Sequence, residues 1–126
     1  MFNGIIGDLY PSVSIPDVDY GNLKVEIENQ IRLLKLQIVP SFITKITQLL
    51  ETQLVRHGVM LVGLTMTGKS TDSLILSKTL TQLKKNGSDD PAHQLTKIFF
   101  LNPKSITADE LYGCFNMNTG EWKDGL

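Results

Sequence analysis

The chain has 126 residues, 41% of them hydrophobic and 20% charged, which is enough apolar material for one ordinary core and leaves little room for a second domain. A formal net charge of −1, without a basic stripe interleaved with aromatic residues, argues against nucleic acid or an acidic membrane as partner. The single cysteine excludes an internal disulfide, and no apolar run approaches the roughly 18 residues of a membrane-spanning helix, so we expect a cytoplasmic protein.

Residues 1–19 are predicted to form an irregular N-terminal segment. Gly4 and Gly7 disfavour a helix, and Pro11 and Pro16 punctuate the chain. The apolar residues of this segment are expected to pack on another part of the protein, because a free apolar arm would be unfavourable in water.

Two amphipathic helices are predicted over residues 20–57. Apolar residues recur at helical spacing after Asp19, which is the expected N-cap of the first helix. Pro40 restarts the chain as the first residue of the second helix, which is expected to end close to Gly58. His57 stands alone near this end, so we interpret it as a capping or packing residue and not as a ligand.

A strand, a phosphate-binding loop, a helix and a second strand are predicted over residues 58–101. The apolar run 59–62 is typical of a buried strand, and it leads into Gly63-Leu64-Thr65-Met66-Thr67-Gly68-Lys69-Ser70, which fits G-x-x-x-x-G-K-[ST]. The following helix is expected to run from Ser70 to Lys85, and the second strand over residues 96–101.

This motif suits the chemistry of a nucleoside triphosphate. Gly63 and Gly68 allow a tight turn whose backbone N–H groups approach the phosphates, Lys69 supplies an ammonium, and the Ser70 hydroxyl is an oxygen ligand for Mg²⁺. The residues predicted to bind the nucleotide are Gly63, Leu64, Thr65, Met66, Thr67, Gly68, Lys69, Ser70 and Thr71. The alternative interpretation, a glycine-punctuated turn with a solvated lysine, does not account for the strand before the turn and the helix after it.

Residues 102–126 are predicted to form a short helix and then a loop or hairpin. Thr107 and Glu110 have the spacing of a capping box, so the acidic pair 109–110 is interpreted as a helix start and not as a catalytic pair. A turn signal at residues 118–120 is expected to display Trp122.

Five blocks of sequence together resemble the dynein heavy chain, at the start of the second AAA+ module of its motor ring, and the axonemal type more closely than the cytoplasmic type. They occur in order and with matching spacing over essentially the whole chain, at residues 2–11, 55–63, 101–107, 111–113 and 121–125. The resemblance implies an α/β fold, a partial P-loop NTPase of the AAA+ type with an incomplete sheet.

The resemblance also implies a function, the ATP-binding portion of a microtubule motor. Its implied cofactors are ATP and Mg²⁺, its implied partners are the neighbouring AAA+ modules, and its implied place is the cytoskeleton, including the axoneme of a cilium or flagellum. We expect no hydrolysis by the chain alone, because the acid that holds Mg²⁺ and a catalytic base are missing. One alternative is a nucleotide-free remnant that only packs on partner modules. A stand-alone P-loop kinase or GTPase is disfavoured, since no N-K-x-D motif is present.

Two departures from the family pattern affect these expectations. Met66 stands where the family usually has glycine, and a left-handed backbone there would cost about 1–2 kcal/mol and weaken nucleotide binding roughly tenfold. An AAA+ module also needs about twice this many residues, so both predicted strands should lack partners. We therefore expect a truncated product or an excerpt that is only marginally stable alone.

Overall fold

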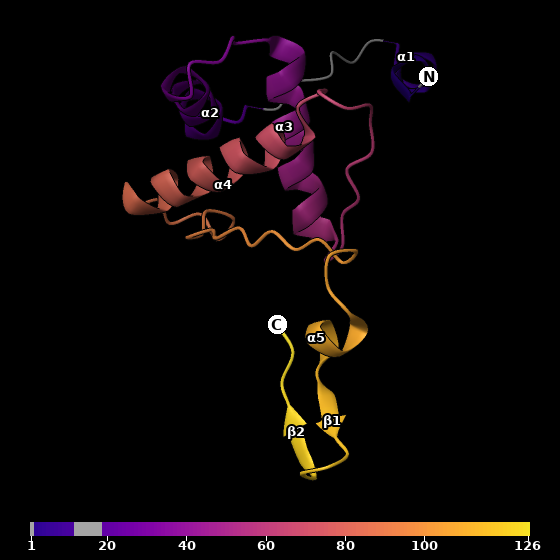
Figure 1. Cartoon of the computed structure of the whole chain (residues 1–126). Helices are drawn as coiled ribbons and strands as arrows, with labels where there is room; N and C mark the ends of the chain where they lie inside the picture. Colours follow the sequence, from indigo (N-terminus) through magenta and orange to yellow (C-terminus); the bar gives the residue numbers. More distant parts are fainter. Residues whose placement is uncertain (1, 12–18) are drawn as a thin grey trace. The chain divides into compact units, whose positions relative to one another are not determined.

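The computed structural model describes residues 2–11 and 19–126, and the chain divides into two compact units between Thr96 and Lys97. The first unit contains the helices α1 (Phe2–Leu9), α2 (Asn22–Leu33), α3 (Pro40–Val55) and α4 (Lys69–Lys85). The second contains α5 (Ala108–Tyr112) and the strands β1 (Cys114–Asn116) and β2 (Glu121–Lys123) (Figure 1). The expected α/β class is confirmed, with helices predominating.

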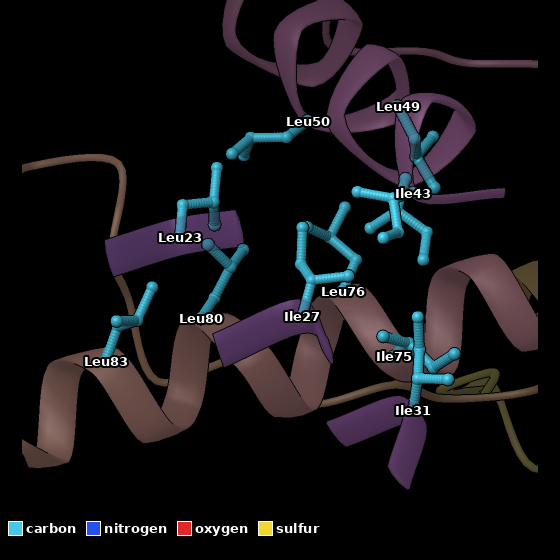
Figure 2. Close-up of a cluster of buried hydrophobic side chains, with 11 residues drawn as sticks. Leu23, Ile27, Ile31, Ile43, Leu49, Leu50, Ile75, Leu76, Leu80 and Leu83 are labelled. Atoms are coloured by element: carbon cyan, nitrogen blue, oxygen red, sulfur yellow. The ribbon is translucent and has the colours of Figure 1, made fainter. Parts of the chain in front are cut away.

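The core of the first unit is a cluster of leucine and isoleucine side chains from α2, α3 and α4. These side chains recur at three- and four-residue intervals, so each helix presents one apolar stripe, and Figure 2 shows the stripes directed toward one another. Ile27, Ile31, Ile46 and Ile75 are completely buried. Each such side chain contributes about 1.5–3 kcal/mol relative to an exposed position, so this contact is what holds the three helices together.

Three helix ends were predicted from local sequence signals, and the structure confirms two of them. Pro40 is the first residue of α3, as predicted. Gly87 has a left-handed backbone after α4, with the Ser88 N–H donating to the Leu83 carbonyl oxygen at 3.1 Å, as expected for a glycine stop. The predicted N-cap of α2 was wrong: Gly21 is the N-cap, because the Asp19 carboxylate accepts instead from the Gly21 N–H at 2.8 Å.

The prediction of an irregular N-terminal segment was wrong for residues 2–9, which form α1. Glycine in a helix interior costs only about 1 kcal/mol relative to alanine, so Gly4 and Gly7 disfavour a helix without forbidding one. Ile5, Leu9 and Tyr10 are exposed, so the expected packing is not found for these three apolar side chains. Pro16 lies outside the described residues.

The prediction of strands at residues 59–62 and 96–101 was also wrong. In the part of the chain that the structure describes, only β1 and β2 pair into a sheet. A strand exists only where a neighbouring backbone accepts and donates its ladder hydrogen bonds, and neither segment has such a neighbour among residues 2–11 and 19–126. Consequently several of their apolar side chains remain in solvent, with Val62 83% exposed and Phe99 88% exposed.

The second unit has the predicted capping box and hairpin. The Thr107 hydroxyl accepts from the Glu110 N–H at 3.3 Å, and the Glu110 carboxylate accepts from the Thr107 N–H at 2.8 Å. In the hairpin, Phe115 lies opposite Trp122, whose indole N–H donates to the Asp124 carboxylate at 2.8 Å. Both parts of this unit are therefore organised by short-range contacts.

The junction of α3 and α4 depends on one glycine. Gly68 is the N-cap of α4 with φ 93°, a left-handed conformation. A Cβ atom at this position would lie 3.0 Å from Cε2 of Phe42, a side chain of α3 that packs against the core. Backbone conformation and packing thus both require glycine here.

We predict that Gly68→Ala lowers the free energy of unfolding by about 1–2 kcal/mol, because alanine is strained at positive φ and its methyl group crowds Phe42. Urea denaturation followed by circular dichroism at 222 nm measures the change. Gly58→Ala is the matched control, since a Cβ there meets nothing within 4 Å, and it should change stability by about 0.5 kcal/mol or less. If the two variants lower the stability equally, backbone conformation and packing do not require glycine at position 68.

The capping box also predicts a pH dependence. The hydrogen bonds from the Thr107 backbone and side chain lower the pKa of Glu110 below its ordinary value of 4.5. Because the folded pKa is depressed, the box is fully formed above pH 4.5 and is lost as the pH falls through the lower folded value. The carboxyl ¹³C NMR titration of Glu110 should therefore have its midpoint below 4.5 and move upward in Thr107→Ala. Thr119→Ala, in the hairpin turn, should leave the midpoint unchanged.

Candidate functional site

The predicted phosphate loop is a turn closed by two of its own side chains. The Lys69 ammonium donates to the carbonyl oxygens of Gly63 at 2.8 Å and Leu64 at 2.5 Å. The Thr67 hydroxyl donates to the same Leu64 carbonyl oxygen at 2.8 Å. These contacts turn the carbonyl groups at the start of the loop toward Lys69.

The backbone N–H groups of this turn are available for a ligand. Within the described chain, no backbone or side-chain acceptor is bonded to the N–H groups of residues 65–71, and the first amide after them, that of Asp72, donates to the Gly68 carbonyl oxygen at 2.8 Å. Unpaired N–H groups at the start of a helix attract an anion, because they concentrate the positive end of the helix dipole. The Ser70 hydroxyl is exposed beside them.

Met66 has the strained backbone that its position in the motif led us to expect. Its φ angle is 67°, in the left-handed region, and its side chain is 97% exposed. A non-glycine residue in this conformation costs about 1–2 kcal/mol, and an exposed side chain makes no packing contact that offsets the cost.

An open cleft of about 470 Å³ adjoins the turn. Of the predicted binding residues, Gly63, Thr67 and Lys69 line it. The others belong to the same turn or to the first turn of α4 but do not line the cleft: Leu64, Thr65, Met66, Gly68, Ser70 and Thr71. The opposite wall is formed by α3, through Lys45, Gln48, Leu49 and Thr52, and by the extended segment 59–62.

Two charged residues of the cleft escaped the sequence analysis. Asp72 lines it and is only 8% exposed, and burial raises the pKa of its carboxyl group, an effect that the charge of Lys45 opposes. The sequence did contain a signal for the burial of Asp72, namely its helical spacing from the apolar residues Ile75 and Leu76. These residues share the buried face of α4. Lys45 belongs to α3, and only the packing of α3 beside α4 brings it to the cleft.

The two histidines lie outside this cleft. His93, in the loop after α4, is buried, and its Nδ1 atom lies 2.6 Å from the Ser88 hydroxyl. His57 is exposed two residues after the end of α3. Among the described helices, none combines the length and apolar character needed to cross a lipid bilayer.

Comparison with known proteins places the chain in a family. The family described as "Hydrolytic ATP binding site of dynein motor region" matches residues 1–70, which is more than half of the chain. Over all 126 residues the chain is 50% identical to human dynein axonemal heavy chain 6, 44% identical to mouse dynein axonemal heavy chain 2 and 42% identical to the dynein-1-beta heavy chain of the flagellar inner arm I1 complex of Chlamydomonas reinhardtii. It spans 3% of the length of each of these relatives. The chain therefore belongs to the dynein heavy chain family, in which its relatives are of the axonemal type.

Proposed function

We propose that residues 63–71 bind the phosphates of ATP and that this chain is a nucleotide-binding portion of an axonemal dynein motor. The observation that carries the proposal is the set of unpaired backbone N–H groups at residues 65–71, next to a lysine that lines the adjoining cleft. The family match supports ATP as the nucleotide.

The close approach of backbone to phosphate is supported by the two glycines of the turn. A Cβ at Gly63 would lie 3.1 Å from the Thr67 hydroxyl oxygen, so a side chain there would crowd the turn. Gly68 has a left-handed backbone that directs the chain from the turn into α4. Both positions thus need glycine for reasons that also suit a phosphate cradle.

Lys69 and Ser70 have the donor chemistry for the ligand and its metal ion. The Lys69 ammonium has three protons, and two are used on the Gly63 and Leu64 carbonyl oxygens, so the third can be donated to a phosphate oxygen while the turn stays closed. The exposed Ser70 hydroxyl is a hard oxygen ligand, which fits Mg²⁺ held jointly with phosphate oxygens. Bound Mg²⁺ would neutralise part of the phosphate charge.

We further propose that the chain binds ATP without hydrolysing it alone. The residue directly after the apolar segment 96–101 is Asn102 and not an acid, and Asp109 and Glu110 lie in the first turn of α5. In the motor, hydrolysis, microtubule movement and contacts with neighbouring AAA+ modules would require the rest of a heavy chain, and the axonemal names of the relatives point to the cilium or flagellum as its place.

We predict that Lys69→Ala weakens ATP·Mg binding by at least about tenfold, because it removes a charge-assisted hydrogen bond to phosphate worth roughly 1.5–3 kcal/mol. Isothermal titration calorimetry on the whole chain measures the affinity, and a phosphate-release assay should show no turnover. Lys78→Ala is the matched control, since Lys78 is an exposed lysine on the same helix that does not line the cleft. Steady phosphate release by the purified chain would contradict the proposal.

A nucleotide-free remnant that only packs on partner modules is the second candidate, favoured by the strained Met66. The two functions differ in the effect of Met66→Gly. If the turn binds ATP, Met66→Gly should bind it at least as tightly as the natural chain, because Met66 already has the left-handed backbone without the nucleotide and relief of its strain stabilises the folded turn. A titration with a fluorescent ATP analogue that stays flat for both the natural chain and Met66→Gly would instead establish the remnant.

A further inference from the structure

Asp72 lines the proposed phosphate cleft, and its carboxylate has no role in the phosphate binding proposed above. Its Oδ1 atom is buried and, among the described residues, has no hydrogen-bond partner. We propose that the Asp72 carboxylate is a specificity-determining residue, which disfavours a free nucleoside triphosphate in the cleft and thereby selects its magnesium complex. This inference rests on the proposed function, because it assumes that a triphosphate binds beside Lys69.

The geometry places this carboxylate and the proposed phosphate-binding lysine in one cleft. Asp72 follows Lys69 by three residues on α4, so the two side chains project from the same side of the helix, and both line the cleft. Lys45 lines it from α3, with its ammonium donating to the Gln48 side chain at 3.0 Å. The charged groups of the cleft are therefore two lysines and one buried carboxylate.

Burial makes this carboxylate more effective than one on the surface. Water and salt screen an exposed carboxylate within about 8–10 Å, whereas a buried one keeps most of its field. At an effective dielectric constant of about 20, two unit charges on the order of 8 Å apart change an equilibrium constant roughly thirtyfold. A free triphosphate carries about four negative charges and its magnesium complex about two, so repulsion by Asp72 must disfavour the free form more strongly.

The test compares Asp72→Asn with the natural chain by calorimetric titration of ATP, once with excess Mg²⁺ and once with a chelator, at pH 8 and constant ionic strength. Asparagine keeps the shape of the side chain and removes its charge. We expect both affinities to rise, and the rise for free ATP to exceed that for the magnesium complex by about tenfold or more. Asp89→Asn, which removes an exposed carboxylate from the loop after α4, should change neither affinity.

Lys45→Gln provides a second variant, whose effect on affinity should be opposite to that of Asp72→Asn, because it removes a positive charge from the same cleft. It should weaken binding of free ATP by a larger factor than binding of the magnesium complex. If Asp72→Asn changes both affinities by the same factor, or neither, the inference is overturned while ATP binding by the cleft stands. If the natural chain binds neither form, the proposed function fails, and the inference fails with it.

Discussion

Everything at the candidate site depends on the packing of α4 against α2 and α3. The buried stripe of α4, from Ile75 to Leu83, fits against the apolar stripes of the other two helices, and this contact fixes the position of the whole helix. Lys69 is the first residue of α4, so the direction of the core-facing stripe also fixes where the ammonium and the first-turn N–H groups point. The site is built on the end of a helix whose body is held by hydrophobic burial.

The turn itself is held by polar contacts of short range. Lys69 and Thr67 bond to the Gly63 and Leu64 carbonyl oxygens, which leaves the N–H groups of the following residues free. The carbonyl groups at the start of the turn therefore face Lys69, whereas the N–H groups of the later residues have no partner within the described chain. This separation gives the turn a positive character, although the chain as a whole has a net charge of −1.

The apolar segments before and after α4 are extended but do not pair into a sheet in the described part of the chain. Residues 59–62 form one wall of the cleft, yet Met60 and Val62 are more than four-fifths exposed. Their backbone groups have no ladder partner among the described residues. An extended, apolar and unpaired segment is a template for adding a strand.

Besides the family resemblance, local signals in the sequence determined the helices α2 to α5, the glycine stop after α4, the capping box at Thr107 and the hairpin. Each depends on residues within a few positions of one another, such as the Thr107–Glu110 pair, or on apolar residues at helical spacing. Only the tertiary structure decided that residues 59–62 and 96–101 are not strands, because strand formation requires a partner that may be far away in sequence. It also decided that Lys45 shares a cleft with Lys69 and Asp72, because Lys45 belongs to α3, and core packing brings α3 beside α4 in a way that no local spacing encodes.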